Sequence, residues 1–140
     1  MLVSTRGRYA LRVMIDLAEH TNPDNSAEAE YIPLADIAKR QGISEKYLES
    51  IIGVLSKSGS LYSLRGKRGG YRLSGKPEEY TVADILKQTE GSFAPVACLE
   101  SDHNDCPHTC DCRTLEMWEH LYKIVGEYLE SVTIADLMKK

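Results

Sequence analysis

All four cysteines of this 140-residue chain lie in one segment, CLESDHNDCPHTCDC, at residues 98–112. They are Cys98, Cys106, Cys110 and Cys112. Clustered thiolates are strong donors for soft transition metals, and the four acidic residues of the segment further favour cation binding. Two histidines of the segment, His103 and His108, are additional candidate ligands. The segment is therefore a candidate metal site rather than a set of unligated surface thiols.

The spacing of the thiols bears on the kind of metal. Seven residues separate Cys98 from Cys106, three separate Cys106 from Cys110, and one separates Cys110 from Cys112. Structural zinc sites usually arrange their ligands as two close pairs, and no CxxC pair of the zinc or thioredoxin type is present. Thiols spread over a polar loop suit an iron–sulfur cluster at least as well.

The elements around this segment have the order of a DNA-binding module. Apolar spacing predicts a helix over about residues 4–21, a second from about residue 33, and a third that Ser44 caps. Two strand candidates, 61–64 and 71–73, flank the turn RGKRGG. Two short helices followed by a hairpin make a winged helix-turn-helix. We therefore predict a mainly α fold with a two-stranded wing.

The third helix and the hairpin are the predicted DNA-contacting elements. The helix turns small and polar residues away from its apolar side, as entry into a major groove requires. Residues 50–77 contain no acid and six basic residues, so the local charge suits a polyanion although the net charge is −4. The predicted contact residues are Arg8, Lys46, Tyr47, Glu49, Ser50, Lys57, Arg65, Lys67 and Arg68.

Three of these residues have specific expected roles. Arg65, on a glycine-rich tip, is a candidate minor-groove probe, and Lys57 can reach phosphates. Glu49 either accepts a hydrogen bond from a cytosine amine or is a solvated carboxylate, and both interpretations stay open. No nucleophile elbow, Walker loop or HExxH motif occurs, so we do not expect an enzyme.

A long helix is predicted after the cysteines. Its apolar residues alternate by threes and fours, which is typical of a coiled-coil seam. A second copy of the chain is the simplest partner, and packing against the first predicted helix of the same chain is an alternative that can hold on another side. The predicted dimer interface consists of Trp118, Leu121, Tyr122, Val125 and Leu129.

The chain thus divides into a DNA-binding domain at residues 1–91, a cysteine-rich loop at 92–112, called the cysteine loop below, and a dimerisation helix with a short last helix at 113–140. Several arginines interrupt the apolar positions of the first residues, so the uninterrupted apolar region of a signal peptide is not present there and we expect none. No apolar run approaches the ~20 residues that span a bilayer. We expect a cytoplasmic protein with reduced thiols and no membrane partner.

The chain closely resembles the Rrf2 family of bacterial winged-helix regulators, the group of IscR, NsrR and CymR. The matching stretches are STRGRYALRVMIDLA, PLADIAKRQGISEKYLESIIGVLSKSG, SLRGKRGGYRL, TVADILKQTEG and TLEMWEHLYKIVGEYLESVTIADL. The resemblance implies a homodimeric DNA-binding repressor or activator whose affinity is tuned by a cluster in the cysteine loop. Because half-sites follow the two-fold axis of a dimer, the expected target is an inverted repeat in double-stranded DNA.

The cysteine loop departs from the pattern of IscR-type members, which have three evenly spaced cysteines and then a histidine. Aligned on Trp118, the three cysteines are Cys98, Cys106 and Cys112, with a first gap longer by two residues. Leu115, which has no donor atom, stands at the place of the histidine.

Cys110 is an extra thiol and is the preferred fourth ligand, with His108 next. In some relatives a residue near the partner subunit's N-terminus completes the ligand set, but this chain has Arg8 and Arg12 there. A 2Fe–2S cluster is preferred, and a 4Fe–4S cluster or zinc stays open. A thiol- or zinc-based regulator without iron, or a metal-handling protein, is the alternative function.

Overall fold

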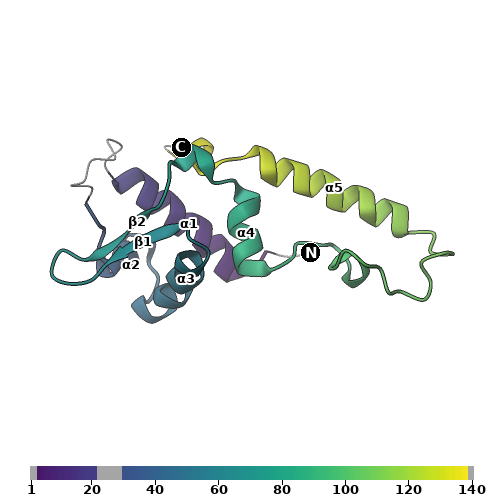
Figure 1. Ribbon diagram of the computed structural model, residues 1–140, viewed down its shortest axis with the longest axis horizontal. Coiled ribbons are helices and arrows are strands. Elements are labelled where there is room, and N and C mark those ends of the chain that lie inside the picture. The colour runs from purple at the N-terminus through teal and green to yellow at the C-terminus, as the bar shows by residue number, and fades with distance from the viewer. Residues whose placement is uncertain (1–2, 22–29, 139–140) are drawn as a thin grey trace.

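The chain folds into a winged helix-turn-helix followed by one long helix (Figure 1). The computed structural model describes residues 3–21 and 30–138. The elements in chain order are α1 (Thr5–His20), α2 (Leu34–Gln41), α3 (Glu45–Lys57), β1 (Leu61–Leu64), β2 (Gly70–Leu73), η1 (Pro77–Glu79), α4 (Val82–Glu90), η2 (Ala97–Leu99), α5 (Leu115–Ser131) and α6 (Ile134–Leu137). The predicted fold class is confirmed, including the two-stranded wing and the long C-terminal helix.

Local signals start and stop the helices of this fold. Ser4 accepts a hydrogen bond from the N–H of Gly7 at 3.1 Å, and Ser44 accepts one from Tyr47 at 3.3 Å. Thr81 and Asp84 form a reciprocal capping box at the start of α4. α2 ends at Gly42, whose φ of 65° is a left-handed conformation that favours glycine.

One hydrophobic core holds α1, α2 and α3 together and includes the base of the wing. We call α1, α2, α3, β1 and β2 the winged-helix unit. The fully buried apolar side chains of this core are Ala10, Val13, Met14, Leu17, Ile37, Leu48, Ile51, Leu55, Ile85 and Ile134. The inward face of α3 is therefore apolar, and its other face is left to solvent.

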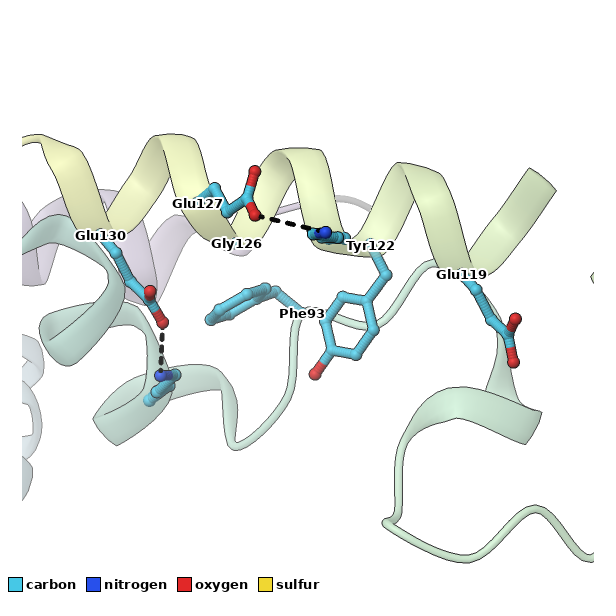
Figure 2. Close-up of a pocket in the computed structure, with 8 residues that line it drawn as sticks. Phe93, Glu119, Tyr122, Gly126, Glu127 and Glu130 are labelled. Atoms are coloured by element: carbon cyan, nitrogen blue, oxygen red, sulfur yellow. Dashed lines mark hydrogen bonds and ion pairs between the residues drawn. The ribbon is translucent and has the colours of Figure 1, made fainter. Parts of the chain in front are cut away.

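α4 is shared between this core and a second one. Ile85 faces the first core, whereas Val82, Ala83 and Leu86 belong to the second. There the rings of Phe93 and Tyr122 meet edge to face, with centroids 5.9 Å apart (Figure 2). α4 therefore lies between the winged-helix unit and α5 (Figure 1).

The C-terminal end of α5 is fastened to the rest of the chain by backbone hydrogen bonds. The N–H of Val82 donates to the carbonyl of Val132 at 2.8 Å, and the N–H of Ile134 donates to the carbonyl of Tyr80 at 2.9 Å. The opposite end of α5 extends away from the winged-helix unit and joins the cysteine loop (Figure 1). The C-terminal end of α5 is thus fixed by hydrogen bonds, whereas its N-terminal end is joined directly to the cysteine loop.

A buried carboxylate joins α1 to α2. Asp16 is 2% exposed and accepts hydrogen bonds from Arg40 Nη2 at 2.7 Å, Arg40 Nε at 3.0 Å and Gln41 Nε2 at 2.7 Å. Burial by itself would raise the pKa of Asp16. The hydrogen bonds from Arg40 and Gln41, together with the charge of Arg40, outweigh burial and hold this pKa below its usual value.

We predict that Arg40→Ala destabilises the fold by about 2–3 kcal/mol near neutral pH, because a buried carboxylate loses its charged partner. This loss of stability is smaller than that expected for a fully buried ion pair, because the Arg40 side chain is 34% exposed. Because the pKa of Asp16 is lowered by folding, its stabilisation is fully present above the unfolded value of ~3.9 and is lost as the pH falls from there through the lower folded value.

Urea unfolding near pH 7 and near pH 4 checks this prediction, with Lys39→Ala as the control at an exposed neighbour. The difference between wild type and Arg40→Ala should shrink on acidification, since Asp16 takes up a proton more readily in the variant. A difference that stays constant with pH would contradict the role of this ion pair.

Candidate functional site

The exposed face of α3 carries the residues predicted to enter a DNA groove. Lys46, Glu49, Ser50, Gly53 and Lys57 are all exposed. The Ser50 hydroxyl donates to the carbonyl of Tyr47 at 2.8 Å. Its side chain therefore lies against its own helix and does not project from the exposed face of α3. Tyr47 is half-buried, and its ring packs edge to face on Tyr9 with centroids 6.0 Å apart.

The wing presents a basic tip. β1 and β2 pair antiparallel, from Leu61 opposite Leu73 to Leu64 opposite Gly70. The three basic residues of the tip, Arg65, Lys67 and Arg68, are exposed, and Figure 1 shows the tip protruding from the body. Gly69 is required there, because a Cβ would collide with the carbonyl of Leu64.

Two further arginines lie at this surface and were not among the predicted contact residues. Arg6 Nη2 donates to the carbonyl of Ser50 on α3 at 3.3 Å, which places its guanidinium beside the exposed face. Arg72 lies against the rings of Tyr31 and Tyr62, at 5.0 and 5.4 Å from their centroids. Sequence signals for the two were weak, because both placements depend on residues distant in the chain.

The basic residues of this surface keep their charges available. Among the ion pairs of the described residues, none uses Lys46, Lys57, Arg65, Lys67 or Arg68. Arg8, also predicted, is exposed and donates to Thr5 Oγ1 at 3.1 Å. Since unpaired cations neutralise phosphates with release of counterions, this surface is suited to a nucleic-acid backbone. As predicted from the sequence, Lys46 and Lys57 lie on α3, and the three basic residues of the tip lie between β1 and β2.

The cysteine loop forms short turns between α4 and α5. Cys98 lies in η2, and the carbonyl of Cys106 accepts from Thr109 Oγ1 at 2.6 Å. All four thiols are free, with Cys98 and Cys106 half-buried and Cys110 and Cys112 exposed. Within residues 3–21 and 30–138, no three Cys, His, Asp or Glu side chains are gathered as a metal site. The donor set fits a metal cluster, but ligation by all four thiols requires the loop to rearrange.

Cys112 has the environment of a reactive thiol. A hydrogen bond with the Thr114 hydroxyl, followed by bonds from backbone N–H groups of Thr114 and Leu115 at the start of α5, lowers the pKa of Cys112. The thiolate is the form that binds metals and attacks electrophiles. The predicted alternative ligand His108 is exposed, and its Nδ1 lies 3.8 Å from Asp111.

α5 has a broad apolar arc that α4 covers on one side. Tyr122 and Leu129, both predicted at a dimer interface, pack in the second core of the same chain. At about 100° per residue, Trp118 and Val125 follow along the arc, and both are half-buried. The far side of the arc is exposed and consists of Met117, Leu121, Ile124 and Tyr128. Packing within the chain therefore involves α4, whereas the expected alternative was α1.

Comparison with known proteins agrees with these features over the length of the chain. The model of the Rrf2 family, described as an iron-dependent transcriptional regulator, matches residues 3–140. Protein rrf2 of Nitratidesulfovibrio vulgaris is 39% identical over 139 residues, which cover 99% of this chain and 88% of that protein.

Solved structures of regulators are also similar. CymR, the global cysteine regulator of B. subtilis, superposes with a TM-score of 0.77 at 33% identity, covering 98% of this chain and 95% of that one. IscR of T. potens superposes with a TM-score of 0.72 at 36% identity, covering 98% and 85%. No helix among the described residues is long and apolar enough to cross a membrane.

We predict that Arg65→Ala and Lys57→Ala impair DNA binding in different ways. Arg65→Ala should cost ~1–3 kcal/mol for a selected site, because a tip arginine reads or enters a groove. Lys57→Ala should weaken binding to all sequences alike and lower the slope of log K against log salt by about 1. Fluorescence anisotropy over a salt series tests both, and equal affinity of wild type and Arg65→Ala for the selected site would contradict the role of the wing.

Proposed function

Because this chain belongs to the Rrf2 family of DNA-binding transcriptional regulators, we propose that it is a homodimeric regulator whose DNA affinity depends on an iron–sulfur cluster in its cysteine loop. It is not an enzyme, since its relatives are regulators. The observation that carries the proposal is the position of four free thiols in the loop that connects α4 to α5. A ligand bound to this loop acts on the end of α4 and on the start of α5.

Cys98, Cys106 and Cys112 are the proposed ligands, and Cys110 is the proposed fourth. Thiolates are the strongest iron donors in the loop, and the lowered pKa of Cys112 favours its ligating form. Leu115 replaces the family's histidine and has no donor. A bound 2Fe–2S cluster would supply a redox-active group whose gain or loss changes the restraint on the loop, with a 4Fe–4S cluster or zinc as the alternative content.

The DNA-binding step follows from the exposed surface of the winged-helix unit. α3 enters a major groove with its small residues toward the bases, and Lys46 and Lys57 contact phosphates. The tip carrying Arg65 reaches the neighbouring minor groove. A two-fold dimer presents two such surfaces, so the target is an inverted repeat.

The dimer forms through the uncovered side of the α5 arc. Met117, Leu121, Ile124 and Tyr128 are 37–66% exposed and are spaced by four, three and four residues. That spacing is the seam of a two-helix coiled coil, and an equivalent helix of a second copy satisfies it. Trp118 and Val125 border the seam and complete the interface, whereas Tyr122 and Leu129 support α5 from behind.

A thiol-based regulator without iron is the second candidate. Cys110 and Cys112 are exposed, and the lowered pKa of Cys112 favours reaction with an oxidant. The structural similarity to CymR, the global cysteine regulator of B. subtilis, favours the same candidate. Iron content after anaerobic purification separates the two.

We predict that the double variant Leu121→Glu with Ile124→Glu is monomeric, because it places four carboxylates in the centre of the seam. Lys123→Glu, on the other side of α5 and 71% exposed, is the control and should remain dimeric. Light scattering gives the mass of each variant. An unchanged dimer in the double variant would show that the interface lies elsewhere.

We predict that Cys98→Ser, Cys106→Ser, Cys110→Ser and Cys112→Ser each lose or destabilise the cluster, whereas His108→Ala retains it. Each variant is reconstituted anaerobically with iron and sulfide, and visible absorption and iron content are measured. If Cys110→Ser keeps a full cluster while His108→Ala loses it, His108 is the fourth ligand and the proposed ligand set is wrong.

A further inference from the structure

The last turn of α4 is hydrogen-bonded to the winged-helix unit on two sides. Gln88 contacts the junction of α3 and β1, and Glu90 contacts the start of α1. The cysteine loop begins almost directly after Glu90, and the first cysteine follows within eight residues. The last turn of α4, which carries both residues, therefore lies between the cysteine loop and the winged-helix unit (Figure 1).

Gln88 fixes the place where the wing leaves α3. Its Oε1 accepts from Ser58 Oγ at 2.5 Å and from Ser60 Oγ at 3.2 Å, and its Nε2 donates to Ser60 Oγ at 3.1 Å. Ser60 is only 3% exposed, and its carbonyl accepts from the N–H of Ser74 at the end of the wing. Because a buried hydroxyl requires a partner, movement of Gln88 must move this junction or break its bonds.

Glu90 fixes the first turn of α1. Its Oε1 accepts from the backbone N–H of Ser4 at 3.1 Å and from Ser4 Oγ at 2.5 Å, the same hydroxyl that caps α1. Gly7 must be glycine for this approach, because a Cβ there would collide with Glu90 Oε1. Arg6, in the same turn, donates to the carbonyl of Ser50 on the exposed face of α3. Glu90 is thus connected to the middle of α3.

The segment that connects α4 to the first cysteine is short and is held in place by Phe93. Phe93 is 8% exposed in the second core and contacts Tyr122 of α5. The loop returns to the chain at the start of α5, whose other end is fixed by Val132. A rearrangement that draws the four thiols together therefore pulls on the end of α4 and on the free end of α5.

We propose that Gln88 and Glu90 are positioning residues that carry the state of the cysteine loop to α3 and the wing. The inference rests on the proposed cluster-dependent function. Displacement of the last turn of α4 moves the α3–β1 junction through Gln88 and moves the start of α1, with Arg6, through Glu90. Neither side chain needs to touch DNA.

The test compares DNA affinity of the full-length protein with and without reconstitution by iron and sulfide. The duplex is a fluorescent site selected from a random library, and the variants are Gln88→Ala and Glu90→Ala. The wild-type ratio of affinities should fall in the roughly 5- to 150-fold range of ordinary allosteric coupling. Each variant should reduce this ratio by about 2- to 30-fold while its iron and sulfide content stays that of the wild type.

Three further variants make the result specific. Lys87→Ala, on the same turn, removes an exposed ion pair to Glu130 of α5, at 3.4 Å, and should keep the wild-type ratio (Figure 2). Gln88→Glu and Glu90→Gln retain an acceptor for the serine hydroxyls and should restore most of the response. In addition, amide hydrogen exchange of metal-free Gln88→Ala should rise at residues 58–64 and stay unchanged in α2.

The outcomes separate this inference from the proposed function. If the wild type responds and both alanine variants respond equally at full cluster content, the transmission through Gln88 and Glu90 is overturned and the proposed function stands. If the DNA affinity of the wild type is the same with and without the cluster, the proposed function and this inference are both overturned. Unchanged hydrogen exchange at residues 58–64 in Gln88→Ala would also contradict the positioning role.

Discussion

The structure depends on one short helix that is buried on two sides. α4 has nine residues, yet Ile85 is fully buried against the winged-helix unit and Leu86 is buried against Phe93 and the side of α5. Burial of one such side chain stabilises the fold by about 1.5–3 kcal/mol. Because packed interiors transmit displacements, two cores that share a helix cannot move independently. α4 thereby packs the winged-helix unit against the long helix and the start of the loop before it.

Most element boundaries could be predicted, since they depend on signals within three or four residues. Ser44 starts α3 as predicted, and the apolar spacing of α3 identified its buried face. β1 has the predicted bounds, and β2 begins at Gly70, one residue earlier than predicted. The position of the basic residues on α3 and the wing tip followed from these elements. The family resemblance was confirmed by comparison.

Features that depend on distant partners could not be predicted. Asp16 lies on the polar side of its helix in the sequence, but Arg40 and Gln41, 24 and 25 residues away, make it a buried ion-pair centre. Arg6 reaches Ser50 across 44 residues, and Glu90 reaches Ser4 across 86. On α5, the apolar arc was visible in the sequence, but the part that α4 covers was not. Periodicity shows that a face is apolar and does not identify what covers it.

The cysteine loop decides between regulators that bind a cluster and those that use free thiols. Its donor set fits iron, but among the described residues its thiols are not gathered as a metal site, so a cluster would require the loop to rearrange. The most direct measurement is the iron and acid-labile sulfide content of the full-length protein purified anaerobically from cells. We expect about two iron and two sulfide per chain, with visible absorption that disappears when the cluster is removed. Protein that contains zinc or no metal under these conditions would contradict it.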